Sequence, residues 1–179
     1  MSLILDHQVF ENTFAGQRDR LALEILYGTG IRLSELINLQ TNRIDLVQRV
    51  MKVLGKRNKE RIIPLSQSLC QLIRSYLSIK NEEFPGNDNH FLIVSNKGEK
   101  CYPMMINRVV KKYLQGASTD KKSPHILRHT YATHLLERGA DLNAVKDLLG
   151  HQSLAATQIY THNSLGKLKK VFDQAHPKA

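Results

Sequence analysis

The chain has 179 residues and a formal net charge of +10, with 26 Lys and Arg against 16 Asp and Glu. This length suits one domain with a sizeable core, and a hydrophobic content of 41% is ordinary for a soluble fold. No apolar run is long enough to span a membrane and no signal peptide is visible, so we expect a cytoplasmic protein. The positive charge favours a polyanionic partner such as DNA, although a basic solvated surface would have the same composition. Cys70 and Cys101 lack metal-site spacing and are expected to be reduced thiols.

The first part of the chain predicts two helices and a hairpin. Residues 1–13 show no clear period and form a lead-in. The apolar stripe of 17–27 predicts a helix, which is broken by glycines before a second helix over 33–39. Residues 49–54 and 61–65 are rich in β-branched side chains and flank a polar turn, so they predict a hairpin with Lys56 near its tip.

The middle and end of the chain add mainly helices. Ser66 is expected to cap a helix to about Lys80, which a loop over 81–90 follows. Further elements are expected at 91–95 (a third strand), from Pro103 to about Gln115 (a helix) and at 164–174 (a last helix with one apolar side). We therefore predict an α+β fold, mainly helical, with a small antiparallel sheet.

The segment 123–150 contains residues that typically start and end helices, and they predict two short helices. Pro124 suits a first helical turn and Gly139 a helix end. Asp141 is expected to cap the second helix, which ends at Gly150.

Groups that can bind phosphate gather in and after these helices. His125 and Arg128 stand at i and i+3 and share a helix face, His151 follows the second helix, and Tyr160 comes nine residues later. Short connections can bring Arg128, His151 and Tyr160 around one point. A guanidinium matches phosphate oxygens with a bidentate fork, and nearby positive charges stabilise the phenolate of an attacking tyrosine. The segment carries no carboxylate pair or acidic cluster, so the sequence does not support a two-metal site.

The same residues permit two other interpretations. His125, His129 and His134 could be metal ligands, because histidines at i and i+4 occur in zinc sites. However, no glutamate stands between the first two, and Arg128 would repel a cation. We rank metal binding below phosphate binding, and expect His129 and His134 to be packing or surface residues. Tyr160 could be a core aromatic, but its flanking residues are polar.

Several separated motifs resemble those of the tyrosine site-specific recombinases, the lambda-integrase family, with the closest likeness to its Xer-type members. They are GTGIRLSEL at 28–36, GKRNKER at 55–61, HILRH at 125–129, LLGH at 148–151 and QIYTH at 158–162. The resemblance covers the chain from about Phe14 onward and implies a catalytic domain over 14–179. Such proteins also carry an N-terminal helical domain that clamps the DNA, and no segment here corresponds to it.

The resemblance implies DNA cleavage and rejoining that needs no metal, ATP or other cofactor. In it Tyr160 attacks the scissile phosphate and forms a 3′-phosphotyrosyl link. The other implied roles are phosphate binding by Arg32, Arg128 and His151, movement of the tyrosine proton by His125, and protonation of the leaving 5′ oxygen by Lys56. Glu35 is expected to orient a cationic neighbour.

The resemblance also implies partners. They are double-stranded DNA, contacted in the hairpin by Arg57, Lys59 and Arg61, and other recombinase protomers in a tetramer joined through the C-terminal helix. Without DNA this helix is expected to fold back on its own chain or to be disordered. Two residues depart from the familiar pattern: Arg57 where glycine is common in the turn, and Ala156 where threonine often precedes the tyrosine helix.

Two other functions remain open at the level of sequence. A type IB topoisomerase-like enzyme, which nicks and closes DNA, uses nearly the same set of residues. A DNA-binding module that is inactive when isolated is the second alternative, although all six residues with implied catalytic roles are present.

Overall fold

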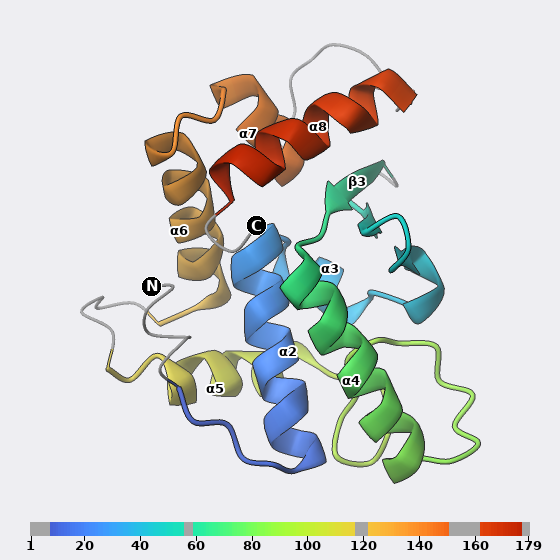
Figure 1. The fold of residues 1–179 in the computed structure, drawn as a ribbon. Coiled ribbons are helices and arrows are strands. Elements are labelled where there is room, and N and C mark those ends of the chain that lie inside the picture. Colours follow the sequence, from blue (N-terminus) through green and yellow to red (C-terminus); the bar gives the residue numbers. More distant parts are fainter. Residues whose placement is uncertain (1–7, 56–58, 117–121, 151–161, 177–179) are drawn as a thin grey trace.

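Helix α2 (Phe14–Thr29) lies at the centre of the fold, with α4, α5 and α6 packed around it (Figure 1). The computed structural model describes residues 8–55, 59–116, 122–150 and 162–176. Thr13 caps α2 by accepting a hydrogen bond from the Gly16 N–H at 3.1 Å. The helix is buried on several sides, because other helices cover it in more than one direction.

The bounds of most of the remaining helices lie close to the predicted ones. They are α3 (Leu33–Ile37), the short 3-10 helix η1 (Thr41–Arg43), α4 (Gln67–Glu83), α5 (Pro103–Tyr113), α6 (Pro124–Glu137), α7 (Leu142–Leu149) and α8 (His162–Ala175). Ser66 caps α4 as expected, and the Asp141 carboxylate caps α7 by accepting from two backbone N–H groups. Helix α4 continues to Glu83, so the expected loop begins three residues later than predicted.

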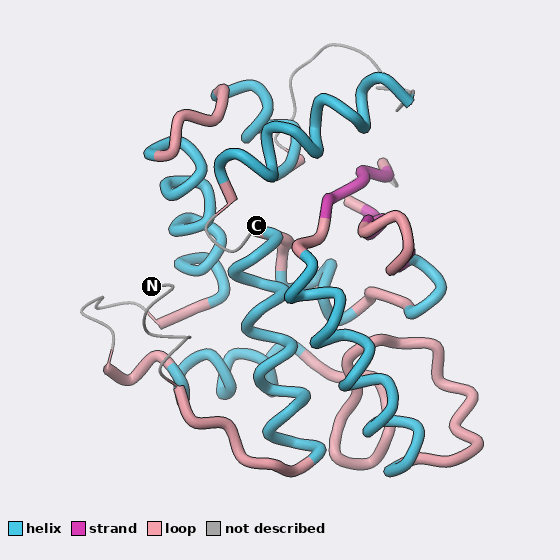
Figure 2. Tube along the Cα trace, in the orientation of Figure 1, coloured by secondary structure: helices cyan, strands magenta, loops and turns pink. Residues whose placement is uncertain are grey.

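The sheet is small and antiparallel, in the order β1 (Ile44–Asp45), β2 (Val50–Leu54), β3 (Glu60–Pro64). Its register pairs Met51 with Ile63 across β2 and β3. Figure 2 shows the strands together at one side of the molecule, near α8. This confirms the predicted hairpin and the predicted fold class.

The third strand predicted at 91–95 is wrong. This segment forms only single bridges, between Gln40 and Phe91 and between Val94 and Lys100. Leu92, Ile93 and Val94 are fully buried, so the apolar run fills the core instead of pairing along a sheet. The third strand is β1, whose two residues are too few to give a periodic signal.

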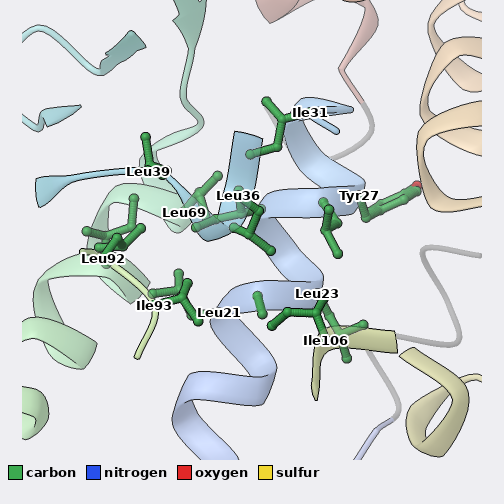
Figure 3. Packing of buried hydrophobic residues seen from close by; sticks show 14 of the residues in the cluster. Leu21, Leu23, Tyr27, Ile31, Leu36, Leu39, Leu69, Leu92, Ile93 and Ile106 are labelled. Carbon is green, nitrogen blue, oxygen red and sulfur yellow. The ribbon is translucent and has the colours of Figure 1, made fainter. Parts of the chain in front are cut away.

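The buried apolar side chains form two clusters. The larger surrounds α2 and includes Leu21, Tyr27, Leu36 and Ile106 (Figure 3). The smaller cluster joins α6, α7 and α8 and consists of Tyr131, Leu135, Val145, Leu148, Leu149, Leu168 and Ala175. The second cluster fixes α7 against α6 and therefore positions the end of α7.

The C-terminal helix α8 folds back on its own chain. Phe172 is 1% exposed, and the His176 ring, which stacks on it, lies 2.7 Å from the Gly28 carbonyl oxygen through Nε2. Arg138 donates to the His176 carbonyl at 3.1 Å. Of the two conformations expected for this helix, the structure therefore shows the one packed in cis.

Two other expectations concern thiols and membranes. Cys70 and Cys101 are buried free cysteines. Within the described ranges, none of the helices is long and apolar enough to cross a bilayer.

Candidate active site

Arg32 lies at the N-cap of α3, as the sequence placed it. Helix α2 ends at Gly30 in the left-handed conformation, with φ of 61°, and the chain then turns directly into α3. The Arg32 guanidinium donates to Glu35 Oε1 at 3.0 Å and to the Gly150 carbonyl at 3.2 Å. Its side chain keeps 28% exposure, so it can still reach a ligand from solvent.

Arg128 lies in the second turn of α6 and its guanidinium points at the same region. It donates to the carbonyl of Gly30 and, at 2.6 Å, to the carbonyl of Leu149. Burial, together with the charges of Arg32 and Arg61, lowers the pKa of Arg128 to about 10. The group remains charged at neutral pH, and its neighbours show that the site is strongly positive.

Gly30 allows α6 to approach the α2–α3 turn. A Cβ atom at this position would lie 2.4 Å from Tyr131 Cδ1, far closer than van der Waals contact. Glycine also accepts the left-handed backbone that the turn requires. The close approach lets Arg128 reach the Gly30 carbonyl and so brings the two arginines together.

Arg61 lies inside the protein, on β3, and is only 5% exposed. Its guanidinium pairs with the Glu35 carboxylate through two bonds, at 2.7 and 2.8 Å, and its Nε donates to the Leu148 carbonyl at 2.9 Å. This burial differs from the DNA contact expected for Arg61. Period-2 alternation is the signal that could have found it, because Arg61 stands two residues before the buried Ile63 and shares its face.

Glu35 orients the arginines, in agreement with the sequence analysis. It accepts from the Arg32 N–H at 2.7 Å as well as from both side chains. Burial alone would raise the pKa of Glu35, but the hydrogen bonds and positive charges of Arg61 and Arg32 outweigh it and hold the pKa below its usual value. Glu35 is therefore ionised and pairs with two guanidinium groups.

The C-terminal end of α7 receives all three arginines. The carbonyls of Leu148, Leu149 and Gly150 accept from Arg61, Arg128 and Arg32 respectively. The last carbonyls of a helix have no partner within it, and the macrodipole makes this end negative, so cations bind there favourably. The arrangement places the arginines around the residue that precedes His151.

The structure describes only some of the other predicted residues. His125 is exposed on the first turn of α6, three residues before Arg128, and Lys59 is exposed beside the hairpin turn. Lys56, Arg57, His151, Ala156 and Tyr160 lie outside the described residues. The structure thus brings Arg32 and Arg128 together, while the contacts of the tyrosine, the lysine and His151 stay predictions.

The histidines weighed as metal ligands do not form a cluster. His129 is exposed, and His134 lies 2.9 Å from the Tyr27 hydroxyl through Nδ1. Among the residues with described positions, no group of three His, Cys, Asp or Glu side chains is placed to hold a metal ion.

Known proteins resemble this chain along most of its length. Residues 7–166 match the phage integrase family. The tyrosine recombinase XerC of Chlorobaculum parvum (strain DSM 263 / NCIMB 8327) is 44% identical over 168 residues, which are 90% of this chain and 50% of that protein. The chain therefore spans about half the length of this relative.

Solved structures agree in fold. The XerA recombinase superposes with a TM-score of 0.70 at 32% identity, covering 92% of this chain and 60% of that one. XerH bound to palindromic difH substrate, in a post-cleavage complex, has a TM-score of 0.73 at 26% identity and covers 94% and 48%. These matches confirm the resemblance to Xer-type tyrosine recombinases that the motifs indicated. The chain belongs to the phage integrase family.

Proposed function

We propose that this chain cleaves and rejoins double-stranded DNA at a specific site through a 3′-phosphotyrosyl intermediate on Tyr160. The observation that carries the proposal is the convergence of Arg32 and Arg128 on the carbonyls of Leu149 and Gly150, directly before His151. Both guanidinium groups there can bind the non-bridging oxygens of one phosphate.

The proposed chemistry combines these two arginines with the roles that the resemblance to tyrosine recombinases implies for the other residues. The Tyr160 oxygen attacks the phosphorus and forms a phosphotyrosine bond, while the bond to the 5′ oxygen breaks. His125 takes the tyrosine proton, Lys56 gives a proton to the leaving 5′ oxygen, and His151 binds the phosphate. Negative charge builds on the non-bridging oxygens in the transition state, where Arg32 and Arg128 stabilise it.

Rejoining reverses these steps. The 5′ hydroxyl of the same or another strand attacks the phosphotyrosine, and the phenolate leaves. One ester replaces another in each step, so neither ATP nor hydrolysis is required. Attack by a different strand produces recombination.

The partners of this activity belong to the same proposal. Arg57 and Lys59 are proposed to contact DNA near the hairpin tip, and residues 14–179 are proposed to form the catalytic domain. Helix α8 packs in cis here, and we propose that it docks on a neighbouring protomer in a DNA-bound tetramer. XerH, a structural relative, has been solved on its DNA substrate, which supports DNA as the partner.

Covalent trapping tests the proposal. The 179-residue chain is mixed, in EDTA, with a pool of nicked duplexes that have randomised arms, and adducts that survive denaturation are recovered and sequenced. We expect an adduct on Tyr160 with a defined sequence preference. Tyr160→Phe should lose the adduct and still bind DNA. An adduct formed by the Phe variant, or one that EDTA prevents, would contradict the mechanism.

The trapping experiment separates the alternative functions when it is combined with plasmid relaxation and strand exchange. A topoisomerase-like enzyme would relax any supercoiled plasmid and would select no sequence from the pool. A binding module would retain duplexes without forming an adduct. A recombinase should exchange strands between two copies of the recovered site.

A further inference from the structure

Arg61 occupies the interior of the arginine site, between three elements of the fold. It stands on β3, holds Glu35 of α3 and donates to the carbonyl of Leu148 in the last turn of α7. Each of its three guanidinium nitrogens donates a bond to protein, and its side chain is 6% exposed. A direct contact between Arg61 and a DNA phosphate would require these bonds to break.

The chain on either side of Arg61 also fits closely. A Cβ on Gly150 would lie 3.2 Å from Arg61 Nη1, and one on Gly55 would lie 3.6 Å from the same atom. Gly55 directly precedes Lys56, and Gly150 directly precedes His151. The Arg61 side chain therefore lies against the backbone next to both of these proposed catalytic residues.

The charges give Arg61 a further effect on Arg32. The Glu35 carboxylate has two guanidinium partners: Arg61 binds both oxygens, whereas the Arg32 side chain touches one of them at 3.0 Å. A bidentate pair in a buried site is the stronger of the two interactions. Without Arg61, the full negative charge of Glu35 would be left to Arg32 and would compete with a phosphate for it.

We infer that Arg61 is a positioning residue: by holding Glu35 and the end of α7, it leaves Arg32 available to bind the scissile phosphate. This inference rests on the proposed cleavage reaction. It assigns Arg61 no contact with DNA. It also explains why a buried arginine stands in a strand whose other inward side chains are apolar.

The matched variants are Arg61→Met, Arg61→Lys and Arg43→Met. Methionine keeps the unbranched stem of the side chain without the charged group, and lysine keeps the charge without the fork. Arg43 pairs with Glu60, next to Arg61 in the sequence, but that ion pair is half exposed, at 45% and 49%. The fourth variant, Glu35→Gln/Arg61→Met, also removes the carboxylate that would capture Arg32.

Single-turnover cleavage is measured on an ordinary substrate and on one with a bridging 5′-phosphorothiolate, whose leaving group needs no proton. We expect Arg61→Met to cleave about 100-fold more slowly on both, since a misplaced binding group costs this much. Arg61→Lys should be slower than the unaltered protein on both, and Arg43→Met should be unchanged. The double variant should recover at least about ten-fold of the loss, because no free carboxylate remains.

A normal rate in Arg61→Met, or in Arg61→Lys if the Met variant does not fold, would overturn the inference. Rescue of Arg61→Met by the phosphorothiolate would overturn it too, because the defect would then lie with the leaving-group acid. A double variant as slow as Arg61→Met would show that Arg61 acts by packing alone.

A second measurement does not depend on cleavage. The arginine Nε–H signals are followed by NMR while inorganic vanadate, which mimics a five-coordinate phosphate, is added. We expect the Arg32 signal to move in the unaltered protein and to stay in Arg61→Met. If the unaltered protein forms no covalent adduct with DNA, the proposed function fails. The vanadate titration still decides whether Arg61 positions Arg32. Equal vanadate responses in both proteins would overturn it.

Discussion

Arg61 and Glu35 form a two-bond ion pair, at 2.7 and 2.8 Å, between side chains that are 6% and 3% exposed. The pair joins the hairpin to α3, the helix that has Arg32 at its N-cap. Both partners are removed from water, so each depends on the other for its charge to be tolerated there.

Breaking this pair should destabilise the fold strongly. Glu35→Ala leaves the Arg61 charge buried and unpaired, which we expect to lower the free energy of unfolding by about 3–5 kcal/mol. Glu60→Ala removes the partner of Arg43 at an exposed site and should cost at most about 1 kcal/mol. Urea unfolding of the two variants measures the difference. Similar losses in both would mean that burial adds nothing to the Glu35 pair.

Acid should weaken the fold through the same carboxylate. The pKa of Glu35 in the folded state is below its ordinary value of 4.5, whereas in the unfolded chain the group titrates near that value. Below pH 4.5 the unfolded state therefore binds more protons, and stability falls until the pH reaches the folded pKa. Above pH 4.5 the stabilisation is fully present. Urea unfolding across the acid range should show a steeper loss in the unaltered protein than in Glu35→Gln, and parallel curves would contradict this.

Gly150 offers a test that separates backbone strain from contact with Arg61. Gly150 and Gly139 both have positive φ, 65° and 83°, so alanine at either should cost about 1–2 kcal/mol of strain. A Cβ on Gly139 meets nothing within 4 Å, whereas one on Gly150 presses on the Arg61 side chain. We expect Gly150→Ala to be the less stable in urea and to slow covalent adduct formation. Gly139→Ala should form the adduct at the normal rate, and equal adduct rates in both would show that the Arg61 contact is unimportant.

Much of the fold could be predicted because its signals are local. Ser66 and Asp141 cap the helices that the sequence assigned to them, and Gly150 ends α7 as expected. The run Leu92–Val94 was misassigned because an apolar run of this length fits a strand or a buried loop equally well. What decides between them is pairing with distant residues, which the local pattern does not contain.

The site residues also differ in whether local sequence signals could reveal their roles. Local signals place Arg32 at a helix start and Arg128 on a helix face, but the convergence of the two arginines was implied only by the resemblance to tyrosine recombinases. The role of Arg61 could not be read from its place beside a polar, lysine-bearing turn. It depends on Glu35, 26 residues earlier, and on Leu148, 87 residues later, both of which reach it only through the tertiary fold.

Two buried tyrosines provide a paired test of hydrogen bonding. Tyr27 and Tyr131 are both 0% exposed, but the Tyr27 hydroxyl bonds His134 at 2.9 Å, whereas that of Tyr131 finds no partner among the described residues. Tyr27→Phe should cost about 1 kcal/mol, and Tyr131→Phe should be neutral or stabilising, because it removes an unsatisfied polar group. Thermal and urea unfolding check both. A clear loss of stability in Tyr131→Phe would mean that its hydroxyl has a partner.

The last prediction concerns Phe172, a buried aromatic residue on α8. Its ring is 1% exposed and stacks on His176 at 4.2 Å, whereas the neighbouring Asp173 is exposed. Phe172→Ala should lower the free energy of unfolding of the free chain by about 3–5 kcal/mol, and Asp173→Ala should change it little. If α8 moves to a neighbouring protomer on DNA, the Phe172 ring must be buried there too. The same variant should then weaken cooperative assembly of protomers on DNA that carries a complete recombination site, as measured in a native gel. A variant that is less stable alone but assembles normally would show that α8 serves only its own core.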